Sequence, residues 1–233
     1  MPINFTSGVY YFPFEQMFEE LYNISYSYQY HKYLEDWESL LMSFEEKSKN
    51  EYIQVTQRMC KYNKSNLPYE YFQYSQVFPQ FSVQYHYHFD IEQIRKHIDF
   101  NNYQTAFSKK FAKRIVYNKI KTNGNVNLKD EPIILVPFFA PDLQYVLIDG
   151  NLRLSQLSRC PFKKIKYCIF YPLKKDAFLL SIDWGMYWFS NEISMLVNGS
   201  NIDEDIQKRI DCQVKCNTIR EKIFEAPRME SGN

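Results

Sequence analysis

The stretch PIILVPFFAPDLQYVLIDGNLRLSQLSRCPFKKIKYCIFYP, residues 132–172, decides the expected fold of this 233-residue chain. Its two apolar runs, 133–136 and 145–148, predict buried strands, and the Pro141-Asp142 pair between them is typical of a turn. After Asp149-Gly150-Asn151 the apolar residues take helical spacing until Pro161. Residues 164–171 then alternate as a third strand. The predicted unit is strand, hairpin, strand, glycine-containing turn, helix and strand.

The turn at 149–151 is the candidate functional site. A helix that opens at the carboxyl end of a strand presents free N–H groups, which favour an anion. Gly150 lets a ligand approach the backbone, and Arg153 offers a guanidinium with two parallel donors for phosphate oxygens. Asn151 adds an amide, and Asp149 is suited to Mg²⁺ or a ribose hydroxyl. The alternative is structural, because such a turn needs glycine for positive φ and Asp or Asn for capping.

The run VLIDGNLRLSQLSRCPFKKIKYCIFYP, residues 146–172, resembles the core of the ParB/sulfiredoxin superfamily. PIILV stands where that family has its preceding strand, and FSVQYHYHFDIEQIRKHI is similar to its entry strand. The resemblance therefore covers about residues 81–172 and leaves the first third of the chain unexplained. It implies a small mixed β-sheet with a nucleotide-binding turn.

The resemblance gives roles to the turn residues. It implies that Gly150, Asn151 and Arg153 bind the phosphates of a nucleoside triphosphate with Mg²⁺, with Asp149 as the first candidate base for hydrolysis or phosphotransfer. Many members read D-G-N-H-R, where this chain has Leu152 in place of His, so whether it is an enzyme stays open. Asn151 stands where sulfiredoxins place their catalytic Cys, which argues against sulfinic-acid reduction.

The net charge of +1 hides an asymmetry. Residues 101–175 hold 14 basic and 4 acidic side chains, whereas the segments before and after are net acidic. A helix expected over 104–121 would place basic residues opposite its core stripe, and a second basic run follows Pro161. These candidates for nucleic-acid contact are Lys109, Lys110, Lys113, Arg114, Lys163 and Lys164. The alternative function is therefore a DNA- or RNA-binding protein or nuclease of a plasmid, phage or defence system.

The remaining segments predict helices around a small sheet. We expect helix over 13–47, with a break at the alternating SYSYQY of 25–30, and further helices at 51–62, 176–189 and 202–224. Residues 81–89 give the clearest strand, with His86 and His88 on its polar face as a weak candidate for a metal pair. Cys212 and Cys216 share a helix face, which favours packing. The fold class is therefore α+β, with strands near 81–89, 132–138, 144–149 and 164–171 in one mixed sheet.

We divide the chain into an aromatic-rich helical region, 1–80, a ParB/sulfiredoxin-like core, 81–175, and a helical region, 176–233, which together are also compatible with one compact unit. No run of 18 apolar residues occurs, and the five cysteines lack Cys-x-x-Cys spacing. We therefore expect a cytoplasmic protein with reduced thiols and without a membrane partner. A homo-oligomer, and a third function as a protein-interaction module, are also compatible with the sequence.

Overall fold

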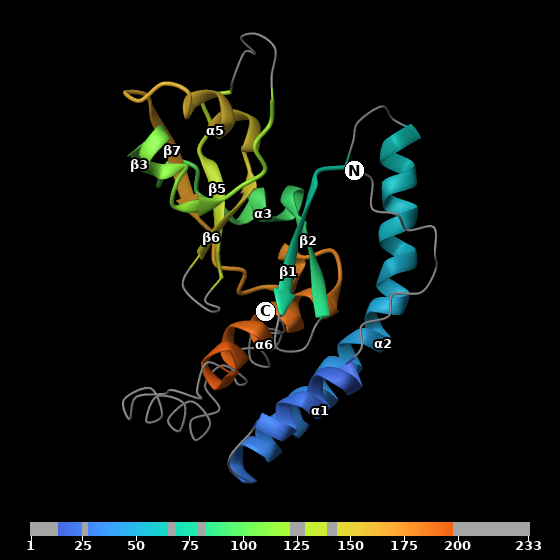
Figure 1. Ribbon diagram of the computed structural model, residues 1–233. Helices are drawn as coiled ribbons and strands as arrows, with labels where there is room; N and C mark the ends of the chain where they lie inside the picture. Colours follow the sequence, from blue (N-terminus) through green and yellow to red (C-terminus); the bar gives the residue numbers. More distant parts are fainter. Residues whose placement is uncertain are drawn as a thin grey trace, which may run out of the picture.

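The computed structural model describes residues 14–24, 28–64, 69–78, 83–121, 129–138 and 144–197 (Figure 1). The described part has the expected α+β class. Its helices are α1 (Phe14–Ile24), α2 (Tyr28–Lys64), α3 (Ile91–His97), α4 (Ser108–Phe111), α5 (Asn151–Leu157) and α6 (Ser181–Val197), with a 3-10 turn η3 at Lys175–Ala177. Its strands are β1 (Tyr71–Phe78), β2 (Val83–Asp90), β3 (Gln104–Phe107), β4 (Ile115–Val116), β5 (Ile133–Phe138), β6 (Gln144–Asp149) and β7 (Lys164–Ile169).

The strands, glycine-containing turn and helix expected within residues 132–172 are confirmed, while the predicted turn at Pro141-Asp142 lies outside the described residues. Strands β5 and β6 pair antiparallel, α5 follows, and β7 returns parallel to β5. The complete sheet has the order β3-β7-β5-β6-β4, with β3 antiparallel to β7 and β4 parallel to β6. Because β5 is central and covered on both faces, all six of its residues are buried, as a continuous apolar run predicts.

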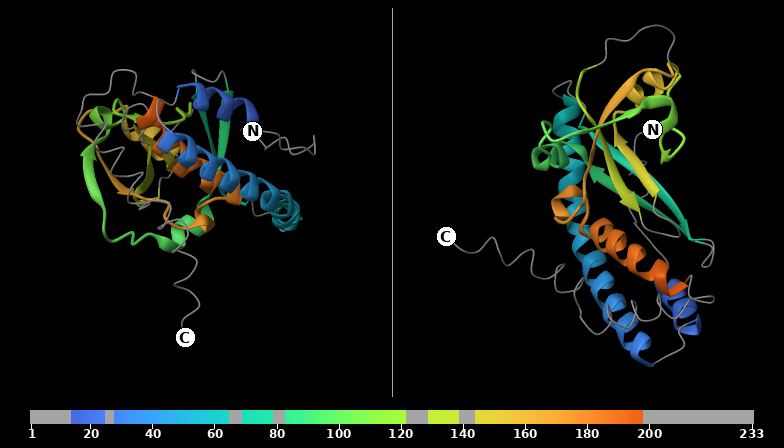
Figure 2. Two further views of the ribbon diagram at one scale, coloured as in Figure 1. Left: turned by 90° about the horizontal axis from the view of Figure 1, so that it is seen from below. Right: turned by 90° about the vertical axis from the view of Figure 1, so that its left-hand side faces the viewer.

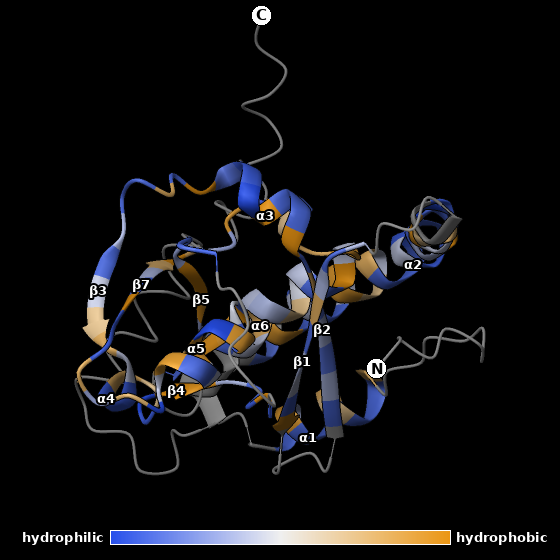
Figure 3. Cartoon of the chain, turned by 90° about the horizontal axis from the view of Figure 1, so that it is seen from above, coloured by the Kyte–Doolittle hydropathy of each residue, from blue (hydrophilic) through white to orange (hydrophobic). Residues whose placement is uncertain are grey.

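Alternate residues of β5 and β6 separate two hydrophobic cores. Ile134 and Val136 of β5 face the larger core, which α1, α2, β2 and α6 also line. Ile133 and Leu135 face the smaller one, which Leu154 of α5 closes. Figure 2 shows the helices α1, α2 and α6 gathered on one side of the strands, and Figure 3 shows β5 largely in the orange of apolar residues. The larger core thus draws on all three regions into which the sequence was divided.

The predicted strand at 81–89 exists as β2, but its expected place in the main sheet is wrong. Among the described strands it pairs with β1, in a separate antiparallel hairpin with Tyr71 opposite Asp90, and Phe89 also forms an isolated bridge with Phe178. Tyr87 and Phe89 pack their rings against Phe138, at the end of β5. Packing of aromatic side chains therefore joins the hairpin to the main sheet, where backbone hydrogen bonds were expected.

The predicted helix at 104–121 is also wrong. Residues 104–107 form β3, α4 is a single turn, and residues 115–116 form β4. Phe107 and Phe111 have helical spacing, yet Phe107 is about half exposed while the Phe111 ring packs against Tyr167 in a tilted arrangement. Tertiary pairing with β7 and β6 therefore overrides the local helical pattern.

The other helices follow the sequence with shifted limits. α2 runs through both the end of the 13–47 segment and the 51–62 segment without interruption. Its start at Tyr28 agrees with a break in the SYSYQY stretch, whose residues 25–27 lie outside the described part. The helix expected at 176–189 begins at Ser181, after η3. The helix expected at 202–224, with Cys212 and Cys216, lies outside the described residues.

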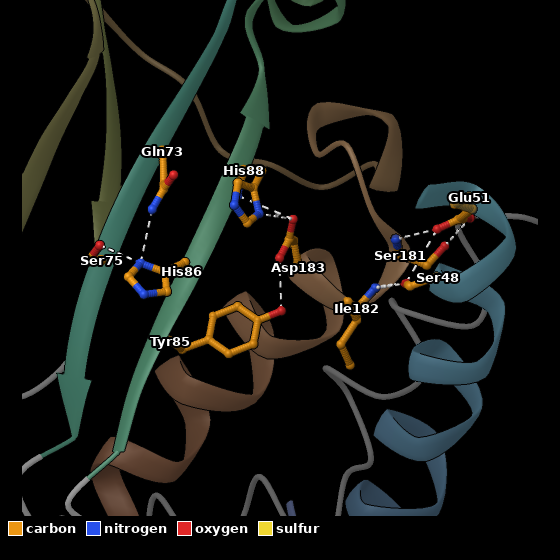
Figure 4. A network of polar contacts seen from close by, with 10 residues as sticks. All are labelled: Ser48, Glu51, Gln73, Ser75, Tyr85, His86, His88, Ser181, Ile182 and Asp183. Atoms are coloured by element: carbon orange, nitrogen blue, oxygen red, sulfur yellow. Dashed lines mark hydrogen bonds and ion pairs between the residues drawn. The ribbon is translucent and has the colours of Figure 1, made fainter. Parts of the chain in front are cut away.

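The first turn of α6 is capped by side chains of α2 (Figure 4). Glu51 accepts hydrogen bonds from the Ser181 amide at 2.6 Å and from its hydroxyl at 2.5 Å. Ser48 Oγ accepts from the Ile182 amide at 2.9 Å. These bonds satisfy amides that a helix N-terminus leaves without intrahelical partners. Burial raises the pKa of Glu51, but the hydrogen bonds from Ser181 and the nearby Lys175 outweigh it, so the pKa is lowered.

Replacement of Glu51 by Gln is expected to lower the free energy of unfolding by about 1–2 kcal/mol at pH 7, the usual worth of a cap. A lowered folded-state pKa gives stability that is present above the unfolded-state pKa and lost as the pH falls through the folded-state value. Urea unfolding at pH 7 and pH 3.5 should therefore show a smaller loss on acidification for the variant than for the wild type. Glu46→Gln on the same helix, which pairs only with exposed Lys49 among the described residues, is the control. Equal effects of the two changes would contradict the capping role.

Candidate functional site

The predicted turn has the backbone that glycine permits. Gly150 takes the left-handed conformation with φ of 99° and is the N-cap of α5. A Cβ at this position would lie 2.4 Å from Cγ2 of Ile133 and 3.1 Å from Nε of Arg153. Both the dihedral angle and the close approach of β5 therefore require glycine.

The carboxylate of Asp149 lies between two arginines. Arg95 of α3 donates to its Oδ2 from Nε at 3.1 Å and from Nη2 at 2.7 Å. Arg153 brings Nη2 to 3.5 Å from the same oxygen. Burial lowers the pKa of Arg95, but the surrounding carboxylates, Asp149 first, outweigh burial and raise it. The Arg95 guanidinium is therefore held as a cation beside the turn.

Arg153 is mostly buried and has partners inside the protein. Its Nη1 donates to the Glu131 carbonyl oxygen at 2.8 Å and lies 3.6 Å from the Glu131 carboxylate. Its side chain is 10% exposed. The guanidinium thus joins the start of β5 to α5 and has a structural use within the fold.

Asn151 fixes the segment that follows β4. Its Oδ1 accepts from the Asn118 amide at 2.8 Å, and Ser155 Oγ accepts from the Ile120 amide at 2.9 Å. These bonds position residues 118–120 beside the turn. The four predicted site residues are therefore brought together, while Asn151 and Arg153 are already hydrogen-bonded within the chain.

An open pocket of about 410 Å³ lies over the turn. Its lining includes all four predicted residues, and adds charged residues that sequence reasoning missed, namely Glu70, Arg95, Lys129 and Glu131. Arg95 lies in α3, 54 residues before Asp149, and no spacing rule relates the two positions. The lining carries three acidic and three basic side chains, so both signs of charge meet at the turn.

The described residues contain no group of three or more His, Cys, Asp or Glu side chains arranged to hold a metal ion. The histidines of β2 have other partners (Figure 4). His86 Nδ1 is 2.7 Å from Ser75 Oγ, whereas His88 Nδ1 is 3.1 Å from Asp183 Oδ2 in the interior. Burial and the neighbouring His88 lower the pKa of His86.

The two basic runs of the sequence meet at Ser108, although the helix predicted to carry the first run does not form. The Ser108 amide donates to the Lys163 carbonyl at 2.9 Å. Its buried hydroxyl lies 2.8 Å from the carbonyls of both Leu157 and Lys163. Ser108 thus ties α4 to the turn between α5 and β7. Residues 109–110 and 163–164 consequently flank one junction.

Exposed cations and aromatic rings surround this junction. We call these exposed side chains the basic surface. Its residues are Phe107, Lys109, Lys110, Lys113, Arg114, Arg159, Phe162, Lys163 and Lys164. Its seven cations form no ion pair with the described residues, and Phe162 is 87% exposed. Lys164 Nζ lies 5.6 Å from the centre of the Phe107 ring.

Comparison with known proteins gives no relative: no protein-family model, curated protein or solved structure matches the chain. Within the part of the chain that the structure describes, no helix is both long and apolar enough to cross a membrane.

Replacement of Gly150 by Ala is expected to lower the free energy of unfolding by roughly 1–3 kcal/mol, because the new Cβ meets Ile133 and adopts a left-handed backbone. The comparison is with Leu152→Ala, two residues away and half-buried, for which loss of apolar surface is the only expected cost. Chemical denaturation of the two variants measures the difference. A Gly150→Ala protein as stable as the wild type would show that the turn tolerates a side chain.

Proposed function

We propose that the chain binds nucleic acid through the basic surface. The observation that carries the proposal is the junction at Ser108, which brings two cationic runs about 50 residues apart in sequence onto one exposed area. A polyanion gains affinity from such cations by releasing counterions. Contacts of this kind position a phosphate backbone without reading its sequence.

The aromatic rings favour single-stranded nucleic acid over a duplex. Phe162 is almost fully exposed and Phe107 half exposed, beside lysines that would contact phosphates. Bases of a single strand stack on aromatic side chains, whereas the bases of a duplex are already stacked on one another. We therefore expect a short single strand to bind with little sequence preference.

Simultaneous replacement of Lys163 and Lys164 by Ala is expected to weaken binding of a fluorescein-labelled 20-nucleotide single strand. The slope of log affinity against log salt should fall by about 0.7 for each phosphate that the variant no longer neutralises. Fluorescence anisotropy from 50 to 300 mM NaCl measures both quantities. Lys49→Ala with Lys61→Ala, on α2, removes the same charge elsewhere and is the control. No binding by the wild type, or equally weakened binding by the control, would refute the proposal.

A second candidate function is nucleotide binding at the turn, which the ParB/sulfiredoxin resemblance implies. The observation that favours it is the pocket over Asp149, where Arg95 approaches from a distant part of the sequence. The contacts of Asp149 with both arginines use Oδ2, and no described residue bonds Oδ1. Mg²⁺ or a ribose hydroxyl would bind Oδ1, while the arginines would turn to the phosphates.

Arg95→Ala is expected to weaken Mg-nucleotide binding by 10- to 100-fold, because a charged hydrogen bond contributes about 1.5–3 kcal/mol. Calorimetric titration with ATP, CTP, GTP and ADP, with and without Mg²⁺, measures the affinity. Lys96→Ala is the matched control, since this exposed residue is next in sequence and bonds to Gln93. Absence of heat with every nucleotide would rule out this candidate and leave the turn a structural element.

A further inference from the structure

A second site lies at the opposite end of β7 from the basic surface. A groove of about 650 Å³ runs beside residues 168–171, and its apolar lining includes Ile98, Ile169, Phe170 and Leu173. At its rim Tyr171 and Leu173 are more than half exposed. None of the residues that line this groove also lines the pocket over the turn at 149–151.

The groove lies where β7 extends beyond the end of its neighbour β3. The pairing of β3 with β7 ends at Gln104 opposite Tyr167, whereas β7 continues beside β5 to Ile169 opposite Leu135. The Asn102 carbonyl lies 3.6 Å from Cys168 Sγ, so the chain before β3 crosses a side-chain face of β7. Figure 3 shows this connection from α3 swinging outward before it reaches β3.

The hydrogen bonds between β5 and β7 determine which backbone groups of β7 face the groove. The Phe170 amide donates to the Leu135 carbonyl at 2.8 Å, so the amide of residue 170 points to β5. Successive residues of a strand point their N–H and C=O groups to opposite sides. The N–H and C=O of Ile169 therefore point away from β5, past the end of β3, and no described residue bonds them.

We propose that this edge of β7 binds an extended peptide segment of another protein, which adds a short strand next to Ile169. An extended backbone supplies a donor and an acceptor at the spacing of a strand edge, while its alternate side chains fill an adjoining apolar groove. The lining favours an uncharged segment with alternating apolar side chains. Asp99 and Lys174 balance in charge, and His97 Nε2 is already 2.9 Å from Asp176 Oδ2.

A second copy of the chain fits this edge less well. In each copy β3 already occupies the edge from 164 to 167, so two copies could share only the residues from Ile169 onward. Antiparallel pairing about Ile169 could therefore form only a few residue pairs, because residues 164–167 of each copy are already paired with β3.

The test uses the full chain labelled with ¹⁵N and a terminally blocked hexapeptide of alternating Val and Thr. Peptide binding is expected to shift the Ile169 amide resonance and slow its hydrogen exchange. A peptide N-methylated at its two central residues should bind at least about tenfold more weakly, since it lacks the backbone donors. No binding, or equal binding of both peptides, would overturn the proposal. If, without peptide, hydrogen exchange of the Ile169 amide becomes slower as the protein concentration rises, the edge binds a second copy of the chain. That result would also overturn the proposal.

Two variants of the protein provide an independent test of the backbone edge. Ile169→Pro removes the amide that faces the groove but none that bonds β5, and Ile169→Ala keeps that amide while shortening the side chain. Peptide affinity should fall about tenfold more for the proline variant than for the alanine variant. Thermal unfolding of both checks that they are folded, and the N-methylated peptide decides the matter if the proline variant is not. Equal affinities of two folded variants would refute the role of the backbone edge.

Discussion

Burial of β5 on both faces is the constraint on which the rest of the structure depends. A strand with no exposed residue needs apolar layers on either side, and alternation sends Ile134 and Val136 to one core and Ile133 and Leu135 to the other. The short helix α5 closes the smaller core, so the chain must turn sharply after β6. Gly150 permits that turn because any side chain there would collide with Ile133. The candidate site is thus located where the packing of β5 demands a glycine.

Polar side chains in this fold are used mainly as connections between elements. Asp183 in the interior accepts from Tyr85 at 2.8 Å and lies against His88, which joins α6 to β2. Ser108 similarly joins α4 to the turn before β7, and Arg153 joins α5 to the start of β5. A buried polar group without a partner is costly, so each of these residues is satisfied by a carbonyl, hydroxyl or carboxylate. At the turn, the residues that suit a phosphate are therefore the same ones that stabilise the fold.

Local patterns predicted the part of the fold that local interactions decide. The hairpin, turn and helix of 132–157 follow from apolar runs and from Gly150, since these elements are neighbours in sequence. The helix over 104–121 failed because Phe107 and Phe111 have helical spacing while pairing with β7 decides the backbone. Strand β1 was missed, since its stability depends on β2 and its sequence mixes polar with aromatic residues. Arg95 was missed because only the tertiary fold brings α3, 54 residues earlier, to Asp149.

The direction of the strands explains why both phosphate-binding candidates share one end of the sheet. β5 and β7 run parallel and β6 runs in the opposite direction, so the start of β7 and the end of β6 lie at the same end of the sheet. α5 connects these two points, and the basic residues before β7 follow directly from its last turn. Arg95, Arg153 and Lys129 are balanced there by carboxylates, whereas the cations of the basic surface are not. Among the described residues, the positive charge that no carboxylate balances therefore lies away from the turn, which is the arrangement that the proposed binding of an extended polyanion requires.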